Sequence, residues 1–168
     1  MTPELFWIPG AWRGRLAIAA RPRGGDWLED EAAGWRRAGL EVVVSLLEEE
    51  EAAQLELTSE GPAANSEGLH FVSFPIPDRG VPASLPGALS LLRTIGDALE
   101  EGKSVAVHCR QGIGRSGLVA AGMLVTSGME VNRALAVVSA ARGQTVPETE
   151  AQLRWIQRLA AERLVMAS

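Results

Sequence analysis

Hydrophobic positions along the chain follow two periods, which predict strands alternating with helices and then a helical C-terminal half. Apolar or alternating runs of about four to eight residues are typical of strands, and apolar residues three or four positions apart indicate amphipathic helices. Strands are predicted over residues 5–8, 15–20, 40–47, 69–74 and 104–107. Helices are predicted over residues 26–39, 85–101, 117–127, 130–141 and 147–165.

Local signals mark the ends of two of these helices and one loop. Asp26 occupies an N-cap position with Glu29 three residues later, as in a capping box, and Gly39 closes that helix. Pro147 suits the first turn of the last helix. The Pro, Asn, Ser and Gly content of residues 61–68 predicts a loop.

Two further segments are rich in prolines or in carboxylates. Residues 75–82 contain three prolines and are therefore predicted to form an irregular loop. Glu48 to Glu51 are four adjacent carboxylates that could bind a metal ion. They fall at a predicted helix start, where the helix macrodipole stabilises anions, so we interpret them as a solvated face and expect no metal.

The order of these elements predicts an α/β fold. Residues 40–47 form a nearly continuous run of leucine and β-branched residues, which is typical of a central parallel strand buried on both faces. Residues 5–20 read as a hairpin at the sheet edge. We expect a mainly parallel central sheet flanked by helices, and a single domain over residues 1–168, because the chain is 46% hydrophobic and of ordinary domain length.

Charge and composition exclude several classes of function. The formal net charge of -5 weighs against a nucleic-acid-binding surface or a polybasic membrane-binding face. Apolar runs fall far short of the ~20 residues that a membrane helix needs. The first residues do not resemble a secretory signal, and one cysteine excludes an internal disulfide. We expect a cytoplasmic protein, and its oligomeric state stays open.

The single cysteine, Cys109, stands between a predicted strand and a predicted helix. Gly112 and Gly114 give the connecting turn the backbone freedom to wrap closely around an anion. Amide groups in such a turn, together with a helix N-terminus, form a phosphate cradle. A thiol facing this cradle is expected to be ionised at neutral pH. The fork of Arg115 can bind two oxygens of a tetrahedral oxyanion.

His108 to Gly117 resembles the signature of the cysteine-dependent protein tyrosine phosphatase superfamily, which is His-Cys, five residues and Arg-Ser. The small dual-specificity branch is the most similar, and the resemblance extends over residues 74–156. It implies a phosphatase-like fold of the swivelling β/α type, hydrolysis of phosphomonoesters through a phosphocysteine intermediate, and no cofactor.

The resemblance also implies roles for individual residues. Cys109 would attack phosphorus, and Asp78 would protonate the leaving group and then activate water, although a simple turn role for Asp78 stays open. His108 would orient the loop, and Ser116 could hydrogen-bond the sulfur. Gln152 could place the hydrolytic water or be an ordinary surface residue. The phosphate-binding residues would be Arg110, Gln111, Gly112, Ile113, Gly114 and Arg115.

Three other readings of the motif are less consistent with the sequence. Residues 112–117 match the dinucleotide fingerprint G-x-G-x-x-G, but the acidic strand end expected ~20 positions later is replaced by a predicted helix. A sulfurtransferase also uses a cysteine in an anion-binding loop, but the spacing to Arg115 favours phosphate. A non-catalytic phosphate-binding module usually lacks one of the catalytic residues, whereas Cys109, Arg115 and Asp78 are all present here.

The expected partner is a phosphorylated protein or a small phosphomonoester. A chain this short has no room for the long aromatic recognition elements of tyrosine-specific relatives and contains no Tyr, so we expect phosphotyrosine and also phosphoserine or phosphothreonine. Residues 110–114 lack the lysines typical of inositol lipid phosphatases. Nucleotides, sugars, RNA ends and inositol phosphates stay open as alternative substrates.

Overall fold

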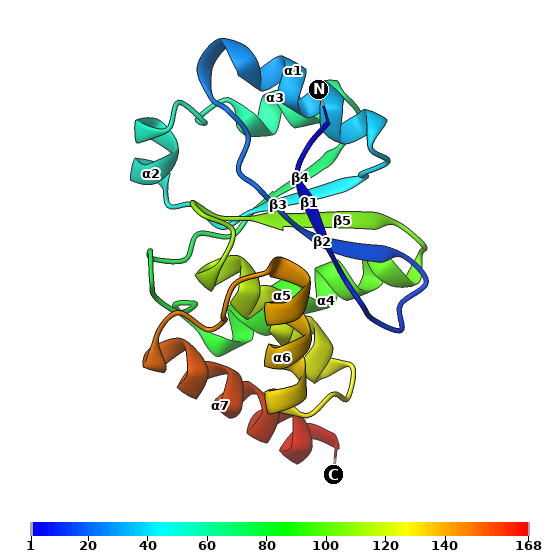
Figure 1. Cartoon of the computed structure of the whole chain (residues 1–168), viewed down its shortest axis with the longest axis vertical. Coiled ribbons are helices and arrows are strands. Elements are labelled where there is room, and N and C mark those ends of the chain that lie inside the picture. The colour runs from blue at the N-terminus through cyan, green and yellow to red at the C-terminus, as the bar shows by residue number, and fades with distance from the viewer. Residues whose placement is uncertain (1, 168) are drawn as a thin grey trace.

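A computed structural model shows a five-stranded sheet between two layers of helices (Figure 1). It describes residues 2–167, with side chains for residues 2–163. The strand order is β1-β2-β5-β3-β4; β1 is antiparallel to β2 and the other pairings are parallel, as predicted. The strands are β1 (Leu5–Ile8), β2 (Arg15–Ala19), β3 (Val42–Ser45), β4 (His70–Ser73) and β5 (Ser104–His108).

The helices divide between the two faces of the sheet. The upper layer in Figure 1 contains α1 and α3, and the lower layer contains α4 to α7. The short α2 follows the carboxyl end of β3. The helical elements are η1 (Gly25–Trp27), α1 (Leu28–Arg37), α2 (Glu49–Gln54), α3 (Glu60–Ser66), α4 (Leu85–Glu100), α5 (Gly114–Thr126), α6 (Val131–Arg142) and α7 (Glu150–Ala167).

The core explains why β3, β5 and α5 occupy the centre. Every residue of β3 is buried, and so are the last four of β5, because helices cover both of their faces. Residues 114–125 of α5 are all buried as well. A helix that is apolar on all sides is stable only inside a protein. The signature segment, residues 108–117, therefore connects two deeply buried elements, β5 and α5.

Three local predictions are wrong. Residues 61–68 were predicted as a loop, yet 60–66 form α3, because Pro62 fits a first helical turn and Ala64 packs against α1 and β4. Asp26 lies within η1 and does not cap α1. Pro147 lies ahead of α7, which begins at Glu150.

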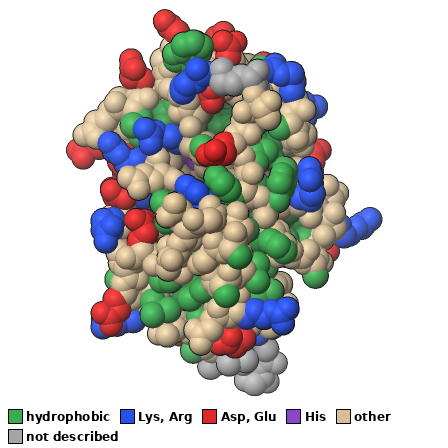
Figure 2. All heavy atoms as spheres, in the orientation of Figure 1, with side chains coloured by type: hydrophobic (Ala, Val, Ile, Leu, Met, Phe, Trp, Pro, Cys, Tyr) green, Lys and Arg blue, Asp and Glu red, His purple; other side chains and the backbone are tan. Residues whose placement is uncertain are grey.

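The surface carries mixed charge. Figure 2 shows acidic and basic side chains interspersed over the visible face, without one large area of a single sign. Among the helices of the described residues, none has the length and apolarity to cross a membrane.

Candidate active site

The cysteine lies at the carboxyl end of β5, in a tight loop that leads into α5. Cys109 directly follows His108, the last residue of the strand. We call residues 109–115 the phosphate loop. Gly112 has a φ of +69°, in the left-handed region that glycine adopts without a steric penalty. The loop can therefore turn within a few residues, as the sequence predicts.

The helix after the loop begins three residues earlier than predicted. α5 starts at Gly114, and a hydrogen bond of 2.8 Å from the Gly117 amide to the Ile113 carbonyl closes its first turn. Arg115 and Ser116 therefore belong to this turn, whose first amide groups have no acceptor within the helix. The positive end of α5 points at the phosphate loop.

A small hollow of about 80 Å³ opens beside the phosphate loop. It brings together Cys109, Arg115 and Asp78, the three residues to which the resemblance assigns chemistry. Cys109 is 3% exposed and the whole of Arg115 is 1% exposed, so both reach the hollow from the interior. The lining residues are Asp78, Arg79, Cys109, Gln111, Gly114, Arg115 and Glu148.

Of the six residues predicted to bind phosphate, Gln111, Gly114 and Arg115 line the hollow. Arg110, Gly112 and Ile113 are not among its lining residues. Arg110 places Nη1 3.9 Å from a carboxylate oxygen of Glu51. Ile113 is the cap residue that precedes α5.

Arg115 is held in place by several acceptors. Its Nη1 donates to Glu51 Oε1 at 2.6 Å and to the Ile76 carbonyl at 2.8 Å. Its Nη2 donates to Glu51 Oε2 at 2.9 Å and to Asp78 Oδ1 at 3.3 Å. The two parallel bonds to Glu51 make a bidentate pair, which fixes both the position and the plane of the guanidinium.

Glu51 corrects the interpretation of residues 48–51 as a solvated face. Glu48, Glu49 and Glu50 are exposed, but Glu51 is 9% exposed and pairs with Arg115. One turn of α2 carries it inward, where Oε1 also accepts the Glu48 amide at 3.1 Å. The buried partner of Arg115 was therefore missed inside a run of four identical residues.

The pairing shifts the pKa values of Glu51 and Arg115 in the directions that keep both groups charged. The hydrogen bond from Arg115 lowers the pKa of Glu51 below its ordinary value, against the effect of burial. Burial works to lower the pKa of Arg115, but its hydrogen bond to Glu51 and the negative charges of Cys109, Glu51 and Asp78 together raise it. Arg115 is therefore a permanent cation beside the sulfur.

Asp78 reaches the hollow from the irregular loop of residues 75–82. The structure contains no helix or strand in this loop, as the prolines predict. The Asp78 side chain is 58% exposed, and one oxygen contacts Arg115. An acid in this position faces both solvent and the anion site, which suits proton exchange with a bound group better than a purely structural turn.

His108 is enclosed on the far side of the phosphate loop. Its Nε2 lies 2.5 Å from Glu60 Oε2, and its Nδ1 lies 3.4 Å from the Cys109 carbonyl. The ring stacks on Trp35 with centroids 6.1 Å apart. Both His108 and Glu60 are nearly inaccessible to solvent. His108 therefore ties the cysteine to the helix layer above the sheet, consistent with an orienting role.

Ser116 does not make the expected hydrogen bond to the sulfur. Its hydroxyl is fully buried and has no hydrogen-bond partner among the described residues. The first turn of α5 places this side chain inside the core, which explains its burial. A buried hydroxyl without a partner is costly, so it is available to a new acceptor.

Gln152 is buried and does not lie on the surface. Its Nε2 donates to the Gly80 carbonyl at 3.1 Å, and its Oε1 accepts the Glu148 amide at 3.0 Å. Thr149 Oγ1 accepts the Gln152 amide at 3.1 Å and contacts the Arg79 carbonyl at 3.5 Å. The start of α7 is thus hydrogen-bonded to the loop that carries Asp78.

Glu148 and Arg79 line the hollow without having been predicted. A Cβ atom on Gly114 would lie 2.0 Å from Glu148 Oε1, so the Glu148 carboxylate packs directly on the backbone of the loop. Arg79 pairs with Glu148 at 3.6 Å across the rim. Neither belongs to the signature segment, and neither stands out in the sequence.

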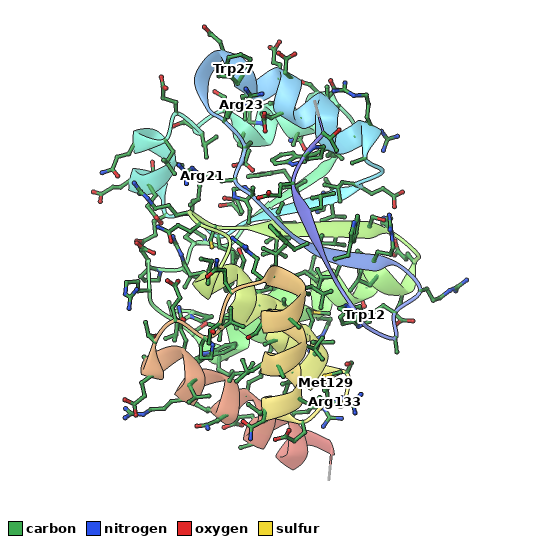
Figure 3. All side chains as sticks on the ribbon, in the orientation of Figure 1. Trp12, Arg21, Arg23, Trp27, Met129 and Arg133 are labelled. Carbon is green, nitrogen blue, oxygen red and sulfur yellow. The ribbon has the colours of Figure 1, made fainter. Side chains whose placement is uncertain are left out.

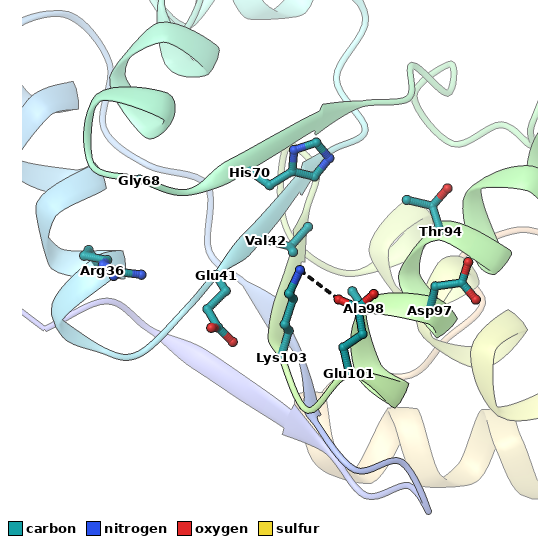
Figure 4. Close-up of a pocket in the computed structure, with 10 residues that line it drawn as sticks. All are labelled: Arg36, Glu41, Val42, Gly68, His70, Thr94, Asp97, Ala98, Glu101 and Lys103. Atoms are coloured by element: carbon teal, nitrogen blue, oxygen red, sulfur yellow. Dashed lines mark ion pairs between the residues drawn. The ribbon is translucent and has the colours of Figure 1, made fainter.

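A larger cavity lies at the opposite end of the sheet (Figure 4). It measures about 400 Å³ and is lined by residues that precede or begin strands, such as Glu41, His70 and Lys103. The signature residues lie at the carboxyl end of β5, and ligands bind at the carboxyl ends of strands in parallel sheets. Size alone would therefore select the wrong site.

Comparison with known families decides the assignment. Residues 18–129, more than half of the chain, match the model of a family described as "Polymorphic toxin system, DSP-PTPase phosphatase". The chain belongs to this family. The resemblance seen in the signature segment, to the cysteine-dependent protein tyrosine phosphatases of dual-specificity type, is thereby confirmed.

Individual relatives of this DSP-PTPase chain agree. It is 38% identical over 94 residues to protein tyrosine phosphatase domain-containing protein 1 of Danio rerio, and 39% identical over 87 residues to that of Mus musculus. These matches cover 55% and 51% of the chain, but only 13% and 11% of the relatives.

Solved structures confirm the fold. Tk-PTP in its active form is 31% identical, with a TM-score of 0.80 over 96% of this chain and 99% of that one. Kinase associated phosphatase with its catalytic cysteine replaced by serine has a TM-score of 0.88 over 98% and 97% of the two chains. At 16% identity, the second comparison supports the fold alone.

Proposed function

We propose that this phosphatase hydrolyses phosphomonoesters through a phosphocysteine intermediate on Cys109. The observation that carries the proposal is the shared hollow, in which the sulfur, the Arg115 guanidinium and the Asp78 carboxyl converge. The phosphate loop and the N-terminus of α5 supply amide donors for the remaining oxygens.

The first step transfers the phosphoryl group to sulfur. The Cys109 thiolate attacks phosphorus, an S–P bond forms, and the bond from phosphorus to the substrate oxygen breaks. Protonated Asp78 gives its proton to that oxygen, so the product leaves as a neutral alcohol or phenol. Arg115 and the loop amides stabilise the charge on the phosphoryl oxygens.

The second step hydrolyses the intermediate. Asp78, now ionised, takes a proton from a water molecule, which attacks phosphorus while the S–P bond breaks. The electron pair returns to sulfur and regenerates the thiolate, and inorganic phosphate leaves.

The charges at the rim favour substrates with a single phosphate. Arg79 is paired with Glu148, and Arg110 lies near Glu51, so the described basic side chains at the rim are offset by carboxylates. This arrangement attracts further anionic groups poorly. We propose a phosphorylated protein as substrate, with phosphotyrosine and also phosphoserine or phosphothreonine accepted, acting in the cytoplasm where a lone thiol stays reduced.

Turnover of a small aryl phosphate tests the activity. The wild type is expected to hydrolyse nitrophenyl phosphate, and Cys109→Ser is expected to lose this activity while keeping the same melting temperature. Rapid quenching in acid followed by mass spectrometry should show one phosphoryl group on the peptide that contains Cys109. Hydrolysis that survives Cys109→Ser would exclude the mechanism.

A substrate panel tests the finer assignment. Phosphotyrosine, phosphoserine and phosphothreonine peptides are compared with a nucleoside monophosphate, a sugar phosphate, an RNA 5′-phosphate and inositol phosphates. A kcat/KM at least tenfold higher for a phosphopeptide supports the protein phosphatase. The same preference for one of the other compounds would replace that assignment and leave the phosphocysteine chemistry intact.

A further inference from the structure

Two arginines outside the signature segment hydrogen-bond to the back of the phosphate loop. Arg142 donates from Nε to the Gly112 carbonyl at 2.6 Å and from Nη2 to the Gln111 carbonyl at 3.1 Å. Arg21 donates from Nη1 to the Arg110 carbonyl. Neither arginine lines the hollow, so both contact the loop from outside it. Figure 3 labels Arg21 beside the loop that follows β2, near α2.

These three carbonyls belong to consecutive peptide groups. In a trans peptide the carbonyl of one residue and the amide N–H of the next point in opposite directions across the same plane. Carbonyls fixed outward at residues 110, 111 and 112 therefore direct the N–H groups of residues 111, 112 and 113 away from the arginines. Because Gln111 lines the hollow and neither arginine does, we take the side away from the arginines to be the side of the hollow.

Arg142 is itself rigidly placed. It is the last residue of α6, and Gly143 ends the helix with a φ of +77°. Its guanidinium carbon lies 4.2 Å from the centre of the Phe6 ring in β1. A planar guanidinium can stack flat on a ring while two of its nitrogens donate, in fixed directions within its plane, to two carbonyls.

We propose that Arg142, assisted by Arg21, is a positioning residue that holds the phosphate-loop amides in their binding orientation. The inference rests on the proposed function, because it assigns those amides to the phosphate. Arg142 touches no substrate and acts only through the backbone of Gln111 and Gly112. Its positive charge also polarises both peptide groups in the direction that strengthens their N–H donors.

Binding of tungstate, measured by calorimetry, tests the proposal separately from turnover. Arg142→Gln is expected to weaken tungstate binding about tenfold or more, because small misplacements in a preorganised site are costly. The KM for nitrophenyl phosphate should rise in similar proportion. Arg21→Gln, which removes one bond from an exposed side chain, should have a smaller effect in the same direction. Methylguanidinium should restore part of the binding to Arg142→Ala.

The matched control is Arg133→Gln, since Arg133 is exposed in the first turn of the same helix (Figure 3). It should bind tungstate as the wild type does. If the wild type binds tungstate and Arg142→Gln binds it with an affinity within twofold of the wild type, the inference is overturned. If the wild type does not bind tungstate, the proposed function is overturned. If Arg142→Gln does not fold, Arg142→Lys decides: native melting with weakened binding supports the inference, and unchanged binding refutes it.

Discussion

Both carboxylate oxygens of Glu51 accept hydrogen bonds from the guanidinium of Arg115, with N–O distances of 2.6 and 2.9 Å, although 64 positions separate the two residues. The pair joins α2 to the first turn of α5 beneath the anion site. Without such a partner, the Arg115 side chain would sample many rotamers in the free protein and lose conformational entropy when phosphate binds. The pair with Glu51 fixes the Arg115 rotamer before phosphate binds.

Glu51→Gln is expected to lower kcat/KM for nitrophenyl phosphate by about tenfold to hundredfold, because Arg115 loses its fixed plane. Steady-state kinetics below the melting temperature measure the effect. Glu50→Gln, which changes an exposed neighbour in the same helix, is the matched control and should be silent. Equal activities of the two variants would show that Arg115 is positioned without Glu51.

The Glu51–Arg115 pair also predicts that the free energy of unfolding decreases at acidic pH. The pKa of Glu51 is lower in the folded chain than its ordinary value of 4.5, so its stabilisation is complete above about pH 4.5 and disappears as the pH falls through the folded pKa. The free energy of unfolding should therefore decrease more steeply on acidification in the wild type than in Glu51→Gln. Parallel urea titrations at several acidic pH values measure the difference, and identical slopes would contradict it.

Glu60 and His108 predict a second effect on stability. Glu60→Leu removes one member of a buried pair and leaves His108 enclosed with an unpaired ring nitrogen, which costs about 1–3 kcal/mol. Thermal and urea unfolding measure the loss. Glu29→Leu, at an exposed position of α1, is the control and should change stability little. A Glu60→Leu variant as stable as the wild type would show that the pair contributes nothing net.

The elements predicted correctly are those whose own residue composition indicates that they are buried. The short length and β-branched content of the β3 and β5 runs favour buried strands, and their order implies the parallel sheet. α3 was missed because its Gly, Pro, Asn and Ser content disfavours a helix locally. Contacts of Ala64 with α1 and β4 stabilise it, and those contacts exist only after folding.

The active site divides in the same way. Cys109 and Arg115 were found because the signature is contiguous. Glu51, Glu60 and Arg142 lie far from it in sequence and reach it through α2, α3 and α6. A glutamate or arginine on a short helix looks the same whether it faces solvent or a buried partner. No signal within single segments distinguishes these residues from surface charges.

Asp78→Asn should slow the hydrolysis of alkyl phosphates by about 10²- to 10⁴-fold, the usual contribution of a general acid. Nitrophenyl phosphate should be affected much less, because its leaving group needs no proton. Asp97→Asn, at an exposed position of α4 on the opposite cavity, is the control. Equal losses on both substrates would remove Asp78 from the acid role and leave it as a partner of Arg115.

Gln152→Ala distinguishes two roles for a buried amide. The bond from Nε2 to the Gly80 carbonyl indicates that Gln152 holds the loop that carries Asp78, so the variant should resemble a weaker Asp78→Asn, with losses concentrated on alkyl phosphates. If Gln152 instead places the hydrolytic water, the variant slows the second step. Phosphocysteine then accumulates, and each substrate with a good leaving group releases its phenol in an initial burst.

Gln157→Ala, on the exposed side of α7, is the control. Stopped-flow kinetics with a series of aryl phosphates of increasing leaving-group basicity separate the outcomes: a steeper dependence than in the wild type supports the loop contact, and a burst with unchanged dependence assigns Gln152 to the water.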